Sequence, residues 1–441
     1  MIIESKRPSA PIRAQQEITY GCNHRCPWCY ALSSDVSLRP SAPADTGKPL
    51  AVARALAESG IFYVTITGGE PLTRKDLTRE VIRIYKDAGV KVSLNSNLTL
   101  LDEDMAQFLS NERVSVLTSC PASEPGDYNS LTGTVNHALF EKGVRLLVSK
   151  GVHVTVNMVV TQLNKGDVIS TARRVSALGV RSFGATPMSL SMDYPRPDLS
   201  LTLEDVRQVI RDLLWVKENI GMEVDIIEAL PKCAFPPEVL RGDYAFLRRK
   251  CQAGETTVSV SPDGEVRPCG HNTNSYGNIL KDGLPAVWAA MGEWAEGKYI
   301  PEQCRTCSWL ERCKGGCRIN AMTARGSWDS MDIWAPGPIA EPPSAVSEES
   351  VTLGGNTLIS VSRSFAFRDE GDGTRLCLNR KDGGFFMVND SLGAFMEDLQ
   401  KREDDTLYPD LVKAYGAEGD GAFGEVVTFL VRKGFLKVKA A

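Results

Sequence analysis

The sequence predicts an α/β protein built on a parallel sheet, followed by a cysteine-rich region and a small α+β domain. Short β-branched runs alternate with amphipathic helical patterns up to about residue 230, and this order is typical of parallel sheets. Seven of the twelve cysteines then lie between Cys233 and Cys317. We expect an α/β domain at 15–230, a cysteine-rich domain at 231–335, a linker at 336–352 and a small domain at 353–441.

Composition is that of a globular protein able to bury a large core. The chain has 441 residues, of which 42% are apolar and 24% charged, and such a length is typical of about three domains. The net charge of -5 argues against nucleic-acid or anionic-membrane partners. No apolar run approaches the roughly 20 residues of a membrane span.

Cysteine usage indicates the compartment. The first ten residues, MIIESKRPSA, lack the apolar core of a signal peptide. Because the cytosol keeps thiols reduced, twelve cysteines without an export signal favour metal clusters over disulfides. We therefore expect a cytoplasmic protein.

The first domain is defined by its order of strands and helices. Amphipathic helices are expected at 77–88, 138–149 and 203–219, where apolar residues recur three and four apart. Strands are expected at 16–20, 62–67, 91–95, 114–119, 153–160, 181–188 and 223–227. In such folds the active site forms at the carboxyl ends of the strands.

Three cysteines, Cys22, Cys26 and Cys29, follow the first predicted strand at C-x3-C-x2-C spacing. Zinc prefers a closed set of four ligands, and an ordinary [4Fe-4S] cluster takes four thiolates, so three leave one iron open. His24 is a strained candidate for a fourth ligand, and we read it as facing solvent or packing in the loop. The pattern thus predicts a cluster with an open iron.

This loop, the aromatic Trp28 within it and the strand before it resemble the radical S-adenosylmethionine (radical SAM) superfamily. The resemblance implies a partial (β/α)6 TIM-like barrel and SAM bound to the open iron through its amino and carboxylate groups. It also implies reductive cleavage of SAM to a 5'-deoxyadenosyl radical that abstracts a substrate hydrogen. A reductase such as flavodoxin or ferredoxin would then supply the electron.

A glycine-rich turn, Gly68-Gly69-Glu70-Pro71, follows the second predicted strand. Two glycines let a backbone approach a ligand closely, although a plain strand-to-helix turn is the alternative. The resemblance places the SAM amine here. It implies that the cofactor contacts are Trp28, Gly68, Gly69, Glu70, Pro71, Ser96, Asn97 and Ser119. The family usually continues the fourth strand with an acidic residue, whereas this chain has Cys120.

The second group of cysteines follows the order C…G-x4-C…C-x2-C-x5-C-x3-C. Read alone, its last four cysteines also fit a zinc knuckle. The longer order resembles the SPASM extension of radical SAM enzymes, which implies two auxiliary clusters and three [4Fe-4S] clusters in all.

The resemblance assigns ligands residue by residue. The first auxiliary cluster would use Cys251, Cys269, Cys317 and, as a plausible fourth ligand, Cys233. The second would use Cys304, Cys307 and Cys313. The family's closing cysteine is replaced here by Asp332, so either Asp332 is an oxygen ligand, or that iron is open, or the carboxylate is merely solvated. Cys120 and Cys377 are read as buried and inert.

The C-terminal region predicts a hairpin followed by three helices. Strands are expected at 374–378 and 384–388, and helices at 390–400, 407–415 and 423–433. This order resembles a winged-helix module similar to the peptide chaperone of pyrroloquinoline quinone biosynthesis (PqqD-like), which binds a leader peptide as an added strand. A DNA-binding winged helix is the alternative, but the third helix has a poor phosphate-binding face.

These resemblances imply a radical SAM maturase that modifies a ribosomally made precursor peptide held through its leader. The modification would be a thioether, a carbon crosslink, an epimerisation or an excision, and no catalytic side chain is assigned. The alternatives are a maturase of a folded protein, of the sulfatase-maturating type, and a non-catalytic iron-sulfur electron carrier or scaffold. Cleavage of SAM to 5'-deoxyadenosine separates the enzymes from the carrier.

Overall fold

The structure is a computed structural model that describes residues 2–3, 6–31, 46–342, 353–402, 405–415 and 420–440. The chain divides into two compact units. The larger is Ala10–Pro343, and the smaller combines Met1–Ser9 with Ser344–Ala441. The extreme N-terminus therefore belongs to the same unit as the C-terminal region, which the sequence did not predict.

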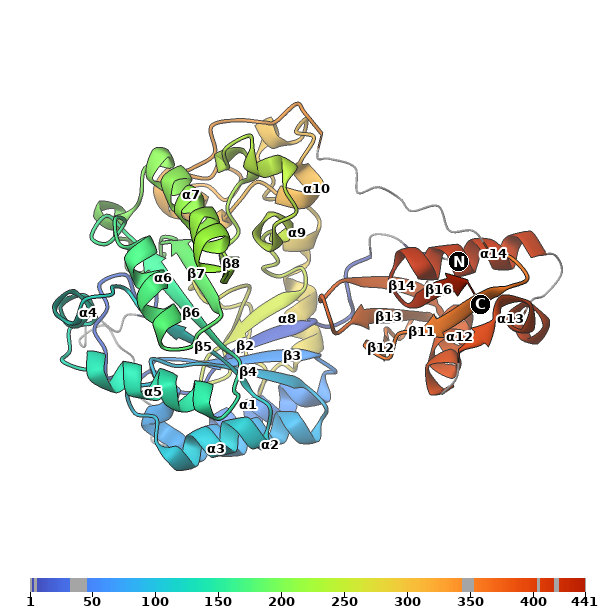
Figure 1. Ribbon diagram of the computed structural model, residues 1–441, viewed down its shortest axis with the longest axis horizontal. Helices are drawn as coiled ribbons and strands as arrows, with labels where there is room; N and C mark the ends of the chain where they lie inside the picture. Colours follow the sequence, from blue (N-terminus) through green and yellow to red (C-terminus); the bar gives the residue numbers. More distant parts are fainter. Residues whose placement is uncertain are drawn as a thin grey trace. The chain divides into compact units, whose positions relative to one another are not determined.

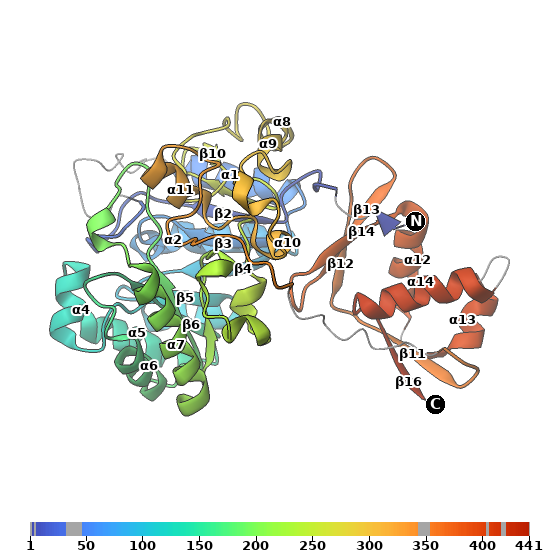
Figure 2. The ribbon, with the colours of Figure 1, turned by 90° about the horizontal axis from the view of Figure 1, so that it is seen from above.

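A nine-stranded sheet is the centre of the larger unit (Figures 1 and 2). Its order is β10-β9-β2-β3-β4-β5-β6-β7-β8, and all neighbours from β9 to β8 are parallel. In the described residues no pairing joins β8 to β10, so the sheet is open like a partial barrel. The strands are β2 Arg13–Glu17, β3 Tyr63–Thr67, β4 Lys91–Asn95, β5 Ser115–Ser119, β6 Val154–Val160, β7 Ser182–Pro187, β8 Glu223–Asp225, β9 Thr257–Val260 and β10 Val266–Arg267.

Helices cover the outer side of this sheet because their apolar faces are buried there (Figure 1). Val81, Ile82 and Tyr85 of one helix are fully buried, as the 3.6-residue period predicts. Four helices absent from the prediction, α1, α3, α4 and α6, complete the alternation with strands. The helices are α1 Gly47–Glu58, α2 Lys75–Asp87, α3 Glu103–Asn111, α4 Pro125–Thr132, α5 His137–Ser149, α6 Val168–Ala177 and α7 Leu203–Ile220.

The cysteine-rich region belongs to the same unit as the sheet. Its strand β9 pairs with β2, the strand before the first cysteine loop, and its residues Val258, Trp288 and Trp334 lie in the core that the sheet and helices form. Its helical elements are η3 Lys232–Ala234, η4 Val239–Arg241, η5 Ala245–Arg248, α8 Leu284–Ala290, α9 Gly292–Ala295, η6 Glu302–Cys304, α10 Leu310–Cys313 and α11 Arg318–Arg325.

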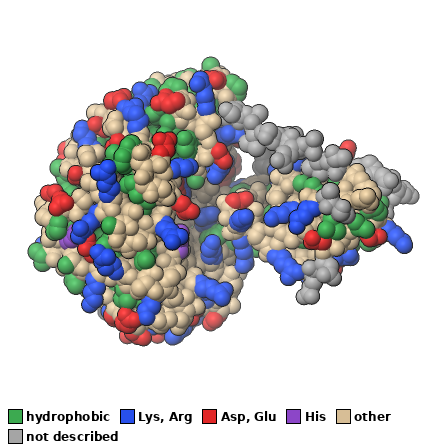
Figure 3. Space-filling view, in the orientation of Figure 1, with side chains coloured by type: hydrophobic (Ala, Val, Ile, Leu, Met, Phe, Trp, Pro, Cys, Tyr) green, Lys and Arg blue, Asp and Glu red, His purple; other side chains and the backbone are tan. Residues whose placement is uncertain are grey.

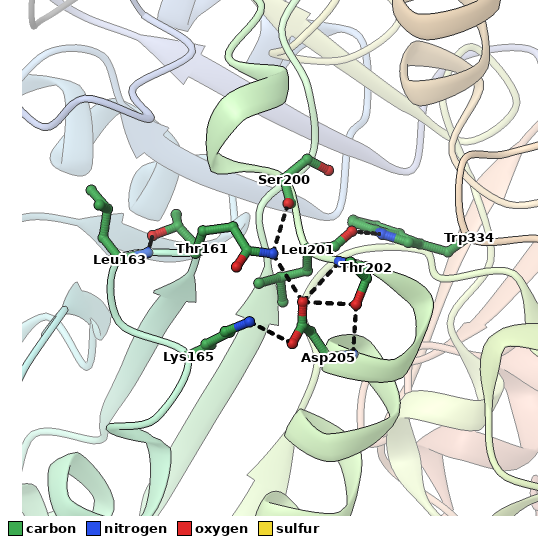
Figure 4. Close-up of polar contacts among 9 residues, drawn as sticks. Thr161, Leu163, Lys165, Ser200, Leu201, Thr202, Asp205 and Trp334 are labelled. Atoms are coloured by element: carbon green, nitrogen blue, oxygen red, sulfur yellow. Dashed lines mark hydrogen bonds and ion pairs between the residues drawn. The ribbon is translucent and has the colours of Figure 1, made fainter.

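The start of α7 anchors the end of the cysteine-rich region to the sheet domain (Figure 4). Thr202 and Asp205 form a capping box at the helix N-terminus, and Lys165 and Gln162 also bond to the Asp205 carboxylate. One residue before this cap, the carbonyl of Leu201 accepts a 2.9 Å hydrogen bond from the indole of Trp334. Trp334 is 2% exposed, so this bond fixes the chain just after Asp332.

The smaller unit has two sheets, of order β1-β14-β13-β12 and β15-β11-β16. The predicted hairpin is present as β13 and β14, whereas β11 and β12 were not predicted. The strands are β1 Ile2–Ile3, β11 Thr357–Val361, β12 Phe365–Asp369, β13 Thr374–Asn379, β14 Phe385–Asn389, β15 Thr406–Leu407 and β16 Leu436–Ala440, and the helices are α12 Asp390–Lys401, α13 Tyr408–Tyr415 and α14 Asp420–Arg432.

Strand β1 covers part of one edge of the smaller unit. Ile2 pairs with Val388 and Ile3 with Met387, antiparallel to β14. The ion pair of Lys6 with Asp372 lies in the same unit. The chain's own N-terminal residues thus occupy an edge to which another strand could be added.

Surface charge in the larger unit is mixed. On the face seen in Figure 3, Lys and Arg side chains are interspersed with Asp and Glu side chains. Among the described residues, no helix has the length and hydropathy needed to cross a membrane.

Candidate functional site

The predicted site residues of the first domain meet at one edge of the sheet. The three-cysteine loop follows β2, Gly68 to Pro71 follow β3, Ser96 and Asn97 follow β4, and Ser119 ends β5. Because parallel strands place their carboxyl ends together, four sequence-distant segments converge there.

The cysteine loop is compact. The amide of Cys29 donates to the carbonyl of Cys26 at 3.1 Å, and the amide of His24 donates to Cys22 Sγ at 3.4 Å. Burial raises the pKa of the Cys26 thiol, and the neighbouring Cys29 and Cys22 raise it further. Three sulfurs therefore lie in one small volume, as ligands of a common metal group must.

His24 is not solvent-facing. It is 4% exposed, and its ring lies edge-on to Tyr128 with 6.3 Å between ring centroids. Burial lowers its pKa to about 4. The imidazole is therefore neutral at pH 7 and packs the loop, which is the second of the two roles expected for it.

Gly68 and Gly69 allow the turn after β3 to dock on the backbone that leads into the cysteine loop. The amide of Gly69 donates to the carbonyl of Thr19 and that of Glu70 to the carbonyl of Gly21, both at 2.7 Å. A Cβ on Gly68 would lie 2.3 Å from the Thr19 oxygen, and one on Gly69 would lie 2.1 Å from the Gly21 oxygen. The close approach in the structure is between two backbone segments, and the ligand contact expected of these glycines stays a prediction.

The Glu70 carboxylate is hydrogen-bonded to the residues that follow the neighbouring strand β4. It is 2% exposed and accepts hydrogen bonds from Ser96 Oγ at 2.7 Å and from the Asn97 amide at 2.7 Å. The amide of Leu72 adds a third at 2.9 Å. Burial raises the Glu70 pKa, and these donors oppose the rise. The carboxylate therefore positions Ser96 and Asn97.

A network of amides that the sequence reasoning missed ties the cysteine loop to the end of β4. Asn97 Nδ2 donates to Asn23 Oδ1, Asn23 Nδ2 donates to Thr99 Oγ1, and the Thr99 hydroxyl donates to Asn97 Oδ1, each at 2.8 Å. Asn23 stands inside the C-x3-C spacing, but nothing in the sequence pairs it with a residue 74 positions away.

The other predicted SAM contacts have separate surroundings. Trp28 is half-buried against the apolar cluster of Met188, Leu190 and Leu199. Pro71 is buried as the first residue of the 3₁₀ turn η1, Pro71–Arg74. Ser119 is exposed at the end of β5.

Cys251, Cys269 and Cys317 form one group in the cysteine-rich region. Burial and the neighbouring Cys251 raise the Cys269 pKa to about 12, while burial, Asp332, Glu228 and Cys251 raise that of Cys317. The carboxylate of Glu228, a residue that sequence reasoning did not select, raises the pKa of all three thiols.

An aromatic stack links this group to the first cysteine loop. Tyr30, which follows Cys29, stacks on His271 with 4.5 Å between centroids, and His271 lies two residues after Cys269. His271 Nε2 lies 3.8 Å from the carboxylate of Glu228. The structure thus brings two regions that are about 240 residues apart in sequence into contact.

Four other cysteines, Cys233, Cys304, Cys307 and Cys313, line a single cavity. Burial, together with the neighbouring Cys313 and Cys304, raises the pKa of Cys233 to about 11, while a hydrogen bond from the Gly337 amide opposes the rise. We expected Cys233 beside Cys251, but the structure places it with the second set.

Asp332 is a buried carboxylate, not a solvated one. It is 0% exposed, and it accepts hydrogen bonds from the Cys317 amide at 2.7 Å and from the Trp334 amide at 3.0 Å. Burial raises its pKa to about 6, although these donors and Arg318 lower it. It is not among the residues that line the four-cysteine cavity.

The two unassigned cysteines lie apart from these groups. Cys120 is 0% exposed, with its thiol donating to the Ala122 carbonyl at 3.3 Å. Cys377 is 0% exposed in the core of the smaller unit, 3.9 Å from the sulfur of Met396. Both have the buried surroundings expected of inert thiols.

The donor sets fit iron-sulfur clusters better than single ions. Among the described residues, no three Cys, His, Asp or Glu side chains lie close enough to hold one metal ion. Zinc would need its sulfurs about 2.3 Å from one ion, whereas the thiolates around a [4Fe-4S] cluster each bind a different iron.

Sequence comparisons agree with this geometry. Residues 17–175 match the sequence profile of the radical SAM superfamily, and residues 251–308 match the SPASM profile, an iron-sulfur cluster-binding domain. The first match spans the three-cysteine loop and the turn after β3, and the second spans four of the cysteines of the cysteine-rich region.

Similar proteins include enzymes with different substrates. The chain is 26% identical to the PqqA peptide cyclase of Gluconobacter oxydans over 74% of its own length and 90% of that protein. It is 24% identical to the AdoMet-dependent heme synthase of Methanosarcina barkeri, over 75% and 98% respectively. Its fold is similar to that of SuiB of Streptococcus suis, crystallised with the precursor peptide SuiA, with a TM-score of 0.59, 17% identity, and coverage of 74% of this chain and 76% of SuiB.

Proposed function

Because the chain is an enzyme with a radical SAM domain and a SPASM domain, we propose that it modifies a ribosomally made precursor peptide by hydrogen abstraction. The bound cluster and SAM together would supply a 5'-deoxyadenosyl radical. The observation that carries the proposal is the convergence of the three-cysteine loop, the turn after β3 and the end of β4 at one edge of the sheet.

The residues at this edge have distinct roles in the proposal. Cys22, Cys26 and Cys29 hold the cluster. Glu70 is a positioning residue, because its carboxylate fixes the end of β4. Ser96, Asn97 and Ser119 face the SAM methionyl and ribose groups, and the backbone from Gly68 to Pro71 receives its amine.

A peptide substrate is supported by the similar proteins and by the smaller unit. Both a peptide cyclase and a fold relative crystallised with a precursor peptide are among them. The smaller unit contains a hairpin followed by three helices, and in this proposal it is a PqqD-like module. Its sheet edges would receive the leader as an added strand, and the substrate's alignment with the radical would decide which modification results.

Two variants test the two halves of the proposal. Replacing Cys22, Cys26 and Cys29 together by Ala should abolish reductive formation of 5'-deoxyadenosine while the auxiliary clusters persist. Deleting residues 344–441 should weaken precursor binding at least tenfold and leave uncoupled SAM cleavage nearly unchanged, because the proposal assigns the two activities to separate compact units.

The outcomes separate the rival functions. SAM cleavage that survives the triple replacement would refute the assignment of the cluster to Cys22, Cys26 and Cys29, whereas absence of SAM cleavage by the reconstituted wild-type protein would favour an electron carrier. Unchanged peptide affinity after the deletion would remove the recognition role and favour a folded-protein substrate. A heme precursor consumed in place of peptide would favour the activity that names the relative from Methanosarcina barkeri.

A further inference from the structure

The four-cysteine cavity has a composition that its sequence motif does not predict. Cys304, Cys307 and Cys313 come from one short stretch, but the fourth thiol, Cys233, comes from the 3₁₀ turn η3 more than 70 residues earlier. The other lining residues are mostly apolar, among them Trp309, Leu310 and Ile339. Four soft thiols in apolar surroundings are the donor set of a closed iron-sulfur site.

Backbone amides already point at two of these sulfurs. The amide of Lys232 donates to Cys313 Sγ and the amide of Ile339 donates to Cys307 Sγ, both at 3.3 Å. Hydrogen bonds to cluster thiolates help to set cluster potentials. The hydrogen bond from the Lys232 amide also fixes turn η3, which bears Cys233, against Cys313. The fold itself therefore keeps Cys233 beside the other three cysteines.

The segment after Trp334 closes the cavity. Ala335, Gly337, Pro338 and Ile339 line it. This segment is held by hydrogen bonds from the Ser308 amide to the Ile339 carbonyl at 3.0 Å and from Trp309 Nε1 to the Glu341 carbonyl at 3.0 Å. The start of the expected linker is therefore a wall of the cavity.

Asp332, the sequence-based candidate for closing this cluster, is not among the residues that line the four-cysteine cavity. Both carboxylate oxygens are bound by backbone amides, those of Cys317 and Trp334. A Cβ on Gly316 would lie 2.8 Å from Asp332 Oδ2. The carboxylate therefore packs against the backbone that leads to Cys317 and keeps that loop in place.

We propose that Cys233 takes the place of the missing downstream cysteine and closes the second auxiliary cluster together with Cys304, Cys307 and Cys313. This inference rests on the proposed function only in assuming that the SPASM region holds iron-sulfur clusters. It leaves the second cluster without an open iron. The three-thiolate group is then Cys251, Cys269 and Cys317, so any exchangeable iron belongs to the first auxiliary cluster, beside Glu228.

The test uses the full-length, anaerobically reconstituted protein. Cys233→Ala should lose about four irons and four sulfides per chain, the same loss as Cys307→Ala, because each removes one ligand of the same [4Fe-4S] cluster. The double variant should lose no more than either single variant. Cys120→Ala is the matched control for a buried cysteine outside the site, and both it and Asp332→Asn should retain full iron.

Several results would overturn the assignment. One is full iron and unchanged paramagnetic resonance spectra in Cys233→Ala. Another is an iron loss in the double variant that equals the sum of the losses in Cys233→Ala and Cys307→Ala. A paramagnetic resonance spectrum of Cys233→Ala that matches that of Cys269→Ala, or zinc in place of iron in the wild-type site, would also overturn it. Reductive SAM cleavage by the wild-type protein, measured in the same preparation, reports on the proposed function independently.

A measurement on the wild-type protein covers the case in which the variants do not fold. The holoprotein is oxidised in steps, alkylated with a maleimide, and the modified cysteines are located by mass spectrometry. Cys233 should become reactive in step with Cys307 and Cys313. Reactivity of Cys233 in the intact holoprotein, or exposure in step with Cys251 and Cys269, would contradict the proposal.

Discussion

Replacing Gly69 by alanine tests whether the turn after β3 positions the cysteine loop through backbone contact. The new Cβ would lie 2.1 Å from the Gly21 oxygen, 2.4 Å from the Gly21 carbonyl carbon and 2.7 Å from the Tyr20 oxygen, whereas ordinary contacts begin at 3.4 Å. All three obstacles are backbone atoms, and a side-chain rotation cannot relieve them. The two segments must therefore separate by roughly 1 Å, as in other overpacked sites.

The expected magnitude follows from the contacts that this separation disrupts. Overpacking costs about 1–3 kcal/mol, and the bonds from Gly69 to Thr19 and from Glu70 to Gly21 contribute about 1 kcal/mol each. We expect the free energy of unfolding to fall by about 3–5 kcal/mol. A misplacement of about 1 Å at a reacting centre lowers rates roughly 100-fold, so 5'-deoxyadenosine formation should fall by about that factor.

Denaturant titration of the reconstituted protein, calorimetric titration with SAM and a 5'-deoxyadenosine assay measure these effects. Gly126→Ala is the matched control, because its Cβ would meet nothing within 4 Å and the residue lies in α4, where alanine stabilises a helix by up to about 1 kcal/mol. If Gly69→Ala unfolds and binds SAM like the wild type, the backbone explanation is wrong. A variant that keeps wild-type stability but loses SAM binding would instead indicate that Gly69 is needed for access of a ligand.

Two further predictions concern the chain's N-terminus and a buried histidine. Deleting residues 1–5 should strengthen precursor binding about threefold to tenfold, since β1 would no longer compete for β14 and a hydrogen bond contributes about 1 kcal/mol. Fluorescence anisotropy with a labelled leader peptide measures this affinity. An unchanged affinity would mean that the leader binds at another sheet edge. Burial lowers the pKa of His137, although Glu141 opposes this effect. As the pH falls below about 6.5, the histidine is therefore protonated more readily in the unfolded chain than in the folded chain, and this favours unfolding. Wild-type stability should therefore fall between pH 7.5 and 5.5 more steeply than that of His137→Gln, and equal slopes of the denaturation midpoint would contradict this.

Much of the larger unit follows from local sequence patterns. Predicted ranges such as 62–67, 91–95 and 203–219 coincide within a few residues with β3, β4 and α7, because hydrophobic period and β-branching act within one element. The three-cysteine loop was equally easy to recognise from the sequence, since its cysteines lie within eight residues of each other. Strands β9, β11 and β12 were missed, because short strands depend on their neighbours in the sheet more than on their own residues.

The partners of the site residues were decided by tertiary structure. Glu70 was selected for a ligand, but its carboxylate meets Ser96 and Asn97, residues on the next strand. Cys233 was assigned by its order in the chain, and the fold placed it with Cys313 instead. The physical reason is that a residue's chemistry is local whereas its neighbours depend on how the chain packs. The sequence by itself therefore determined which residue types could hold a cluster, and only the packing of η3 against α10 decided which sulfurs line one cavity.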